Sequence, residues 1–185
     1  MKVLELRIPG LLMIQPDVFT DARGEFFETW QTLRYRTAGM TEEFVQDNVS
    51  LSTRGVLRGL HYQVPNPQGK LVTTLIGEVY DVAVDIRVGS PTFGQWEGTM
   101  LSSTNRRQLY IPPGFAHGFQ VTSAEALVHY KCTRGYDPQA QQSVLWSDED
   151  IAIEWPLPPA LSDKDRTAAN LRHLGSDVLP LFSTT

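Results

Sequence analysis

The stretch EVYDVAVDIR, residues 78–87, alternates between apolar side chains and side chains of mixed character. Successive side chains of a β-strand point to opposite faces, so this period of two predicts a strand with one face in an apolar core. The apolar face consists of Tyr80, Val82, Val84 and Ile86. The other face carries Asp81 and Asp85, whose carboxylates must be solvated, paired with cations or lining a cavity.

Short runs of the same kind fill residues 44–132. They are rich in Val, Ile, Thr and aromatic residues, and Gly and Pro interrupt them at intervals typical of an all-β sandwich or barrel. Residues 28–38 are predicted to form a short helix, and Ser162 or Asp163 is the expected N-cap of another. Prolines from position 156 onward mark a carboxy-terminal arm. We therefore expect one domain, residues 1–185, with an arm from about residue 156.

The 185 residues carry a net charge of −5, which argues against a nucleic-acid partner, because such binding needs a concentrated basic face. No apolar run approaches the roughly 20 residues of a membrane helix, and the start MKVLELRIPG lacks the apolar core of a secretory signal. We expect a cytoplasmic protein without a membrane partner. Cys132 is the only cysteine, which excludes an intrachain disulfide and a zinc cluster built on cysteines, and we expect it to be inert core.

Residues 55–63 read GVLRGLHYQ and are followed by QGKLV at 68–72. This pattern resembles the first metal-binding motif of the cupin family, but with the metal ligands altered. Gln63 replaces the second histidine of that motif, and Lys70 stands where its glutamate would be. A cation in the ligand set opposes metal binding, so the sequence favours a site without a metal.

A second stretch, PPGFAH at 112–117, keeps the histidine of the second cupin motif. A weak metal site on His61 and His117 is the remaining alternative, although two imidazoles without a third strong ligand rarely hold a metal. Without a metal, His61 is a candidate for proton transfer, because an imidazole of ordinary pKa, roughly 6.5, accepts and releases protons near neutrality. The alternative for His61 is a hydrogen-bonded structural histidine.

Arg58 and Lys70 lie close to His61 in the sequence and indicate a site for an anionic ligand. Arg58 and His61 would point to opposite faces of a regular strand, so they share a cavity only if the backbone is irregular between them. Gly59 is the natural place for such a β-bulge. Arg58 taken alone is equally consistent with a surface cation.

Along nearly its whole length the chain resembles the dTDP-4-dehydrorhamnose 3,5-epimerase family. The matching segments are residues 19–24, 44–48, 55–63, 77–87, 90–94, 111–119, 130–133 and 161–165. The resemblance implies a cupin-type double-stranded β-helix, or jelly-roll barrel, with short helices in both terminal regions. It also implies a homodimeric, cofactor-independent isomerase of dTDP-rhamnose biosynthesis, which epimerises dTDP-4-dehydro-6-deoxy-D-glucose at C3 and C5 through an enolate.

The resemblance also assigns the catalytic roles. His61 is the base that removes a proton, and Asp165 is the carboxylate that orients it. Tyr130 is the acid on the opposite face of the sugar, and Lys70 lies beside the keto oxygen. The chemistry requires such a set, since a keto group at C4 acidifies the hydrogens on C3 and C5, and one base, one acid and one enolate stabiliser can invert either carbon.

The resemblance implies further substrate-binding residues. Those expected around the sugar and the diphosphate are Gln46, Asn48, Arg58 and His117. Those expected to reach the nucleotide from the neighbouring subunit are Arg23, Phe26 and Glu28. Without the resemblance, Arg23 would be interpreted as a turn residue, Phe26 as a core aromatic and Glu28 as a solvated charge. Gly135 stands where the family usually has an aromatic residue, so Tyr136 is the candidate for stacking on the thymine base from a shifted loop.

Three rival functions remain open. The first is a single-centre epimerase, because Val49 and Thr73 depart from the residues common in the family, and related enzymes epimerise only C3 or only C5 of similar sugars. Retention of the four catalytic residues favours double epimerisation over such an enzyme. The second rival is a metal-dependent cupin oxygenase, and the third is a sugar-nucleotide binding module without catalysis.

Overall fold

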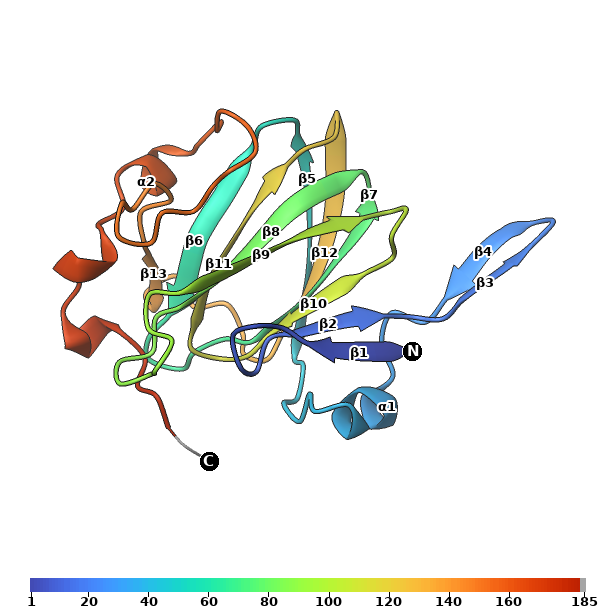
Figure 1. The fold of residues 1–185 in the computed structure, drawn as a ribbon, viewed down its shortest axis with the longest axis horizontal. Helices are drawn as coiled ribbons and strands as arrows, with labels where there is room; N and C mark the ends of the chain where they lie inside the picture. Colours follow the sequence, from blue (N-terminus) through green and yellow to red (C-terminus); the bar gives the residue numbers. More distant parts are fainter. Residues whose placement is uncertain (184–185) are drawn as a thin grey trace.

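The computed structural model describes residues 1–183 and consists mainly of two antiparallel β-sheets packed face to face (Figure 1). The six-stranded sheet has the order β1 (Lys2–Glu5), β2 (Leu12–Gln15), β10 (Gln108–Ile111), β7 (Lys70–Ile76), β12 (Glu125–Cys132) and β5 (Gln46–Thr53). The five-stranded sheet has the order β13 (Gln141–Ser143), β6 (Leu57–Gln63), β11 (Phe115–Val121), β8 (Glu78–Asp85) and β9 (Trp96–Ser102). The predicted all-β class is confirmed.

The space between the sheets is apolar over much of its extent. Its buried side chains include Val72, Val79, Ala83, Leu101, Leu109, Phe115, Phe119 and Val128. A second core covers the outer face of the five-stranded sheet, where the carboxy-terminal arm packs over β6 and β8. Its members include Leu60, Tyr62, Val82, Val84, Ile86, Val144, Ile151, Leu171 and Leu179. Strand β8 is therefore buried on both faces.

The two faces of β8 agree with the alternation in its sequence. The apolar face is core, as predicted, and it lies against the arm. On the other face, the Asp85 carboxylate accepts hydrogen bonds from the Arg87 guanidinium at 2.8 and 2.7 Å. Asp81 on the same face hydrogen-bonds to His117 in the interior. One carboxylate is thus paired with a cation, and the other is buried behind His117, which lines the cleft described below.

A β-bulge lies in β6, where it was predicted. His61 pairs with His117 and Arg58 pairs with Phe119, so three steps along β6 span the same distance as two along β11. Gly59 is in the bulge with φ of +128°, and a Cβ there would lie 2.5 Å from the Cα of Gly118. The bulge turns Arg58 and His61 toward the same cavity.

The helices are short and few. Helix α1 (Thr32–Thr37) is shorter than the predicted 28–38, because the residues before Gln31, the N-cap, are not helical. Ser162 caps α2 (Asp163–Arg166) as predicted, with its hydroxyl accepting a hydrogen bond from the backbone N–H of Asp165 at 3.1 Å. Two 3-10 turns follow, η1 (Leu171–His173) and η2 (Ser176–Val178). None of the helices described in residues 1–183 is long and apolar enough to cross a membrane.

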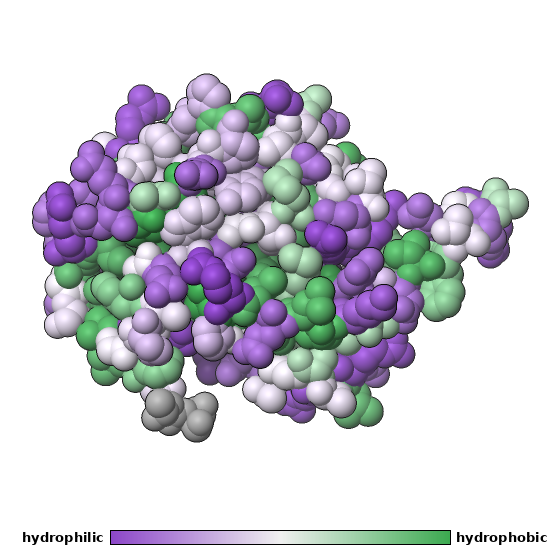
Figure 2. All heavy atoms as spheres, in the orientation of Figure 1, coloured by the Kyte–Doolittle hydropathy of each residue, from purple (hydrophilic) through white to green (hydrophobic). Residues whose placement is uncertain are grey.

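A two-stranded hairpin, β3 (Val18–Asp21) and β4 (Gly24–Phe27), projects from the barrel. It stands clear of the body in both the ribbon and the space-filling views (Figure 1 and Figure 2). Phe19 and Phe26 are cross-strand partners on this hairpin and are 64% and 69% exposed. The hairpin thus presents two large aromatic side chains to solvent within one protomer.

The bulge generates a stability prediction. Gly59→Ala is expected to lower the free energy of unfolding by more than the roughly 1–3 kcal/mol of an unfavourable φ, because its Cβ also collides with the Gly118 backbone. Gly89→Ala is the matched control, since Gly89 has φ of +87° but a Cβ there would meet no atom within 4 Å. Equilibrium denaturation of both variants checks this, and equal losses would contradict it.

Candidate active site

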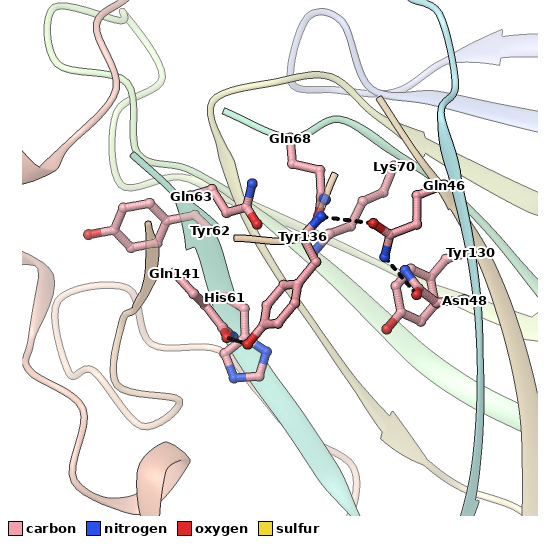
Figure 3. A pocket seen from close by; sticks show the side chains of 10 residues that line it. All are labelled: Gln46, Asn48, His61, Tyr62, Gln63, Gln68, Lys70, Tyr130, Tyr136 and Gln141. Atoms are coloured by element: carbon pink, nitrogen blue, oxygen red, sulfur yellow. Dashed lines mark hydrogen bonds between the residues drawn. The ribbon is translucent and has the colours of Figure 1, made fainter. Parts of the chain in front are cut away.

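A cleft opens between the two sheets, beside the apolar part of the interior. Two adjoining cavities make it up and share His61, Lys70, Tyr130, Tyr136 and Gln141. Figure 3 shows His61 from β6 and Tyr130 from β12 on different sides of this space, with Lys70 among the other side chains that line it. The predicted residues that line the cleft are Gln46, Asn48, Arg58, His61, Lys70, His117, Tyr130, Tyr136 and Asp165.

His61 forms a short hydrogen bond to the arm. Its Nε2 lies 2.6 Å from Oδ1 of Asp165, which α2 places beside β6 although it comes 104 residues later in the chain. The Ser162 hydroxyl donates to Oδ2 of Asp165 at 2.8 Å. Burial alone would raise the pKa of Asp165, but hydrogen bonds from His61 and Ser162 outweigh it and hold the pKa below the usual value. The ionised carboxylate therefore fixes Nε2 as the N–H and leaves Nδ1 to accept a proton.

A second carboxylate–imidazole pair lies deeper. Nε2 of His117 is 3.0 Å from both carboxylate oxygens of Asp81, and its Nδ1 is 3.4 Å from Nζ of Lys70. Burial lowers the pKa of His117, while Asp81 raises it and Lys70 lowers it. Because Lys70 only donates, Nδ1 must be the acceptor and Nε2 the donor to Asp81. The imidazole is thus held neutral and in one tautomer between an anion and a cation.

Lys70 is the cation of the cleft interior. Burial lowers its pKa, and the nearby Cys132 and Asp81 work in the opposite direction. Arg58 lies nearer the arm and donates from Nε to the Ser52 hydroxyl at 3.0 Å. Both predicted cations therefore line the same cleft, as expected for a site that takes an anionic ligand.

The wall opposite His61 is formed by β12 and β5. Tyr130 and Asn48 are register partners there, and burial raises the pKa of the Tyr130 phenol. Gln46 donates to the side-chain oxygen of Asn48 at 2.9 Å. Cys132 is buried as expected, accepts a long hydrogen bond from Asn48, and has a thiol pKa raised by burial. These residues give the wall hydroxyl and amide groups.

The residues expected to serve a neighbouring subunit lie outside the cleft of their own chain. Arg23 is on the projecting hairpin and pairs with Asp21 at 2.6 Å. Phe26 is exposed on the same hairpin. Glu28 pairs with Arg34 at 3.0 Å. The structure brings none of the three to His61 within one protomer.

Several lining residues were not predicted. They are Tyr62, Gln63, Gln68, Phe119, Gln141, Ser162 and Lys164. Asp81, which holds His117, was visible in the sequence only as a carboxylate on the second face of β8. Gln63 was noted solely as the replacement of a metal ligand. Within residues 1–183, no group of three or more His, Cys, Asp and Glu side chains is arranged to hold a metal ion.

Comparisons with known proteins agree along nearly the whole chain. The family model for dTDP-4-dehydrorhamnose 3,5-epimerase matches residues 5–173. The dTDP-4-dehydrorhamnose 3,5-epimerase of Shigella flexneri is 55% identical over 168 residues, which cover 89% of this chain and 93% of the relative.

Solved structures extend the comparison to the fold. A dTDP-6-deoxy-D-glucose-3,5-epimerase from Legionella pneumophila, in complex with dTDP-4-keto-L-rhamnose, has a TM-score of 0.97 at 50% identity, covering 99% of each chain. A 3'-monoepimerase from Streptomyces bikiniensis, in complex with dTDP-quinovose, has a TM-score of 0.89 at 35% identity, covering 96% of this chain and 92% of its own. The predicted cupin-type barrel is confirmed.

The pair formed by Asp81 and His117 generates a prediction about protonation. Asp81→Asn is expected to lower the pKa of His117 further, because it removes the carboxylate that raises this pKa, while the Lys70 ammonium still keeps Nδ1 the acceptor. Imidazole ¹⁵N chemical shifts followed over pH measure both the tautomer and the pKa. Asp165→Asn is the control and should change the signals of His61 while leaving those of His117 in place. A wild-type His117 with its proton on Nδ1 would contradict the arrangement.

Proposed function

The chain belongs to the dTDP-4-dehydrorhamnose 3,5-epimerase family, and from this premise we propose how its residues carry out the reaction. The enzyme is an isomerase that inverts C3 and C5 of dTDP-4-dehydro-6-deoxy-D-glucose to give dTDP-4-dehydro-L-rhamnose. Identities of 55% and 50% to 3,5-epimerases, against 35% to a 3'-monoepimerase, favour double over single-centre epimerisation. The observation that carries the proposed roles is the placement of His61 and Tyr130 on different sheets around one cleft.

His61 is the proposed base. Its Nε2 is anchored by Asp165, so Nδ1 is the nitrogen that removes the proton from the carbon beside the keto group. The imidazolium that forms is then balanced by a buried carboxylate already in contact with it. Proton removal thus creates a charge for which the counter-charge is fixed in advance, which lowers the cost of reorganisation.

Lys70 is the proposed stabiliser of the enolate oxygen. Deprotonation beside the C4 keto group moves negative charge onto its oxygen, and an ammonium in a partly dry cleft stabilises that charge strongly. His117 supports this role because its neutral Nδ1 accepts from Lys70 and restricts where Nζ can lie. Asp81 keeps His117 in the tautomer that can do so.

Tyr130 is the proposed acid that returns a proton on the opposite face of the ring. Burial raises its pKa, so the phenol stays protonated and available as a donor at neutral pH. A phenol is a weak acid, but the enolate carbon it would protonate is a strong base. Arg58 is proposed to bind the diphosphate, with Gln46 and Asn48 holding the sugar by hydrogen bonds.

We also propose a homodimer. Leu51 and Ile76 flank Leu127 on the outer face of the six-stranded sheet. Val49 lies on the same face, two residues before Leu51 on β5. Val49, Leu51 and Ile76 are 60%, 62% and 50% exposed, which makes an uncovered apolar surface. A second copy would cover this surface, and the projecting hairpin would carry Arg23 and Phe26 to the cleft of the partner subunit. The cytoplasmic location stays a prediction.

Deuterium exchange tests the division of labour between His61 and Tyr130. With dTDP-4-dehydro-6-deoxy-D-glucose in deuterium oxide, His61→Asn is expected to slow exchange at C3 and C5 by about 10²- to 10⁴-fold, the usual contribution of a general base. Tyr130→Phe keeps the base and Lys70, so exchange should continue with little net inversion. Proton NMR follows both carbons.

His173→Asn is the matched control for the exchange experiment, because His173 is an exposed histidine outside the cleft. It is expected to exchange and invert the substrate as the wild type does. Deuterium entering C3 or C5 at the normal rate in His61→Asn would show that another residue is the base.

Mixing two defective variants tests the exchange of hairpins. A subunit with Arg23→Ala should have a defective hairpin but an intact His61. A subunit with His61→Asn should have an intact hairpin but no base. A hybrid dimer would then contain one cleft with both residues intact. Refolding equal amounts of the two variants together should restore up to roughly a quarter of wild-type turnover at low substrate. Random pairing makes about half of the dimers hybrids, and each hybrid has one intact cleft of its two.

Each variant refolded alone is the control and should gain nothing. If Arg23 served the cleft of its own protomer, every cleft in the mixture would carry one defect. The mixed sample would then stay as inactive as the separate ones, which would rule out the exchange.

A further inference from the structure

Residues 134–137 cross the mouth of the cleft. They belong to the segment 133–140 that connects β12 of the six-stranded sheet with β13 of the five-stranded sheet, and all four residues are exposed. Tyr136 is the member of this loop that lines the cleft, and its hydroxyl donates to Gln141 at 2.7 Å (Figure 3). Because the loop buries little of its own surface, its position depends on the hydrogen bonds that its backbone makes.

Gln63 holds the loop from the five-stranded sheet. Its side-chain oxygen accepts from the backbone N–H of Asp137 at 3.0 Å, and its amide nitrogen donates to the carbonyl of Gly135 at 3.3 Å. The two bonds bracket Tyr136 on both sides. Gln63 is itself buried, so these bonds are shielded from water.

Two further glutamines bind the same short segment. The side-chain oxygen of Gln46 accepts from the backbone N–H of Tyr136 at 2.8 Å, and the Gln68 amide donates to the carbonyl of Arg134 at 2.7 Å. Side chains thus hold the backbone of four consecutive residues from both sides of the mouth. We call Gln46, Gln63 and Gln68 the glutamine latch.

We propose that Gln63 and Gln68 are positioning residues that hold Tyr136 in place as a preformed wall for the nucleotide end of the substrate. The proposal rests on the function proposed above, which gives the cleft a dTDP-sugar. A loop already fixed in its bound position loses less conformational freedom when the ligand arrives, so the latch contributes to affinity without touching the ligand. Gln63 has this use at the position where a metal-binding cupin carries a histidine ligand.

Binding of dTDP, measured by titration calorimetry, tests the latch apart from turnover. Gln63→Leu removes both hydrogen bonds to the loop and is expected to weaken dTDP binding roughly tenfold. Gln68→Leu removes one bond and should weaken binding less. The matched control is Gln139→Leu, because Gln139 is an exposed glutamine near the same loop whose side chain makes no described hydrogen bond. It is expected to bind dTDP as the wild type does.

A double-mutant cycle separates positioning from a general effect on the fold. If the latch acts through Tyr136, then Gln63→Leu should cost almost nothing further in a Tyr136→Ala background. The pH dependence of turnover should also keep its shape in Gln63→Leu, with the change confined to KM. Gln68 is only partly buried, so Gln68→Leu keeps the cycle measurable should Gln63→Leu fold poorly.

The outcomes distinguish the two proposals. A wild-type protein that does not bind dTDP overturns the proposed function and the latch with it. Wild-type binding with unchanged affinity in Gln63→Leu and Gln68→Leu overturns the latch alone. Losses that add fully to that of Tyr136→Ala overturn the positioning of Tyr136.

Discussion

The close approach of Gly59 to Gly118 is the constraint on which the cleft depends. The extra residue of the β6 bulge fits only because neither position carries a side chain, and a Cβ on Gly59 would also lie 2.7 Å from the His117 carbonyl oxygen. The bulge turns Arg58 and His61 toward one cavity. A barrel with a regular β6 would bury the same apolar core but would separate His61, the proposed base, from Arg58, the cation proposed to bind the diphosphate.

Electrostatic balance explains how so many ionisable groups lie inside a β-barrel. Each imidazole is paired with a carboxylate, His61 with Asp165 and His117 with Asp81. A charge moved out of water is costly unless a partner offsets the desolvation, and the pairs supply that partner before any ligand arrives. Lys70 differs, because its hydrogen-bond partner His117 is neutral and does not offset the charge of the ammonium. A substrate oxygen that becomes negative would supply that missing counter-charge.

Much of this arrangement could be predicted from the sequence, and the rest could not for physical reasons. Alternation in residues 78–87 predicted a strand with one apolar face, and Gly59 predicted the bulge, because both signals are local. The pairing of Asp81 with His117 joins residues 36 positions apart and depends on strand register, which no local pattern encodes. The contacts of Gln63 could not be predicted for a similar reason, since its partners are backbone groups of a distant loop.

The arm that carries Asp165 follows every strand of the barrel in the chain. A ribosome therefore releases the two sheets first and the partner of His61 afterwards, so His61 is made before the carboxylate that it contacts. Docking of the arm then buries the outer face of the five-stranded sheet and brings Asp165 to His61 in the same step. In the proposed mechanism, the pair formed by His61 and Asp165 therefore exists only once the arm has been both made and docked.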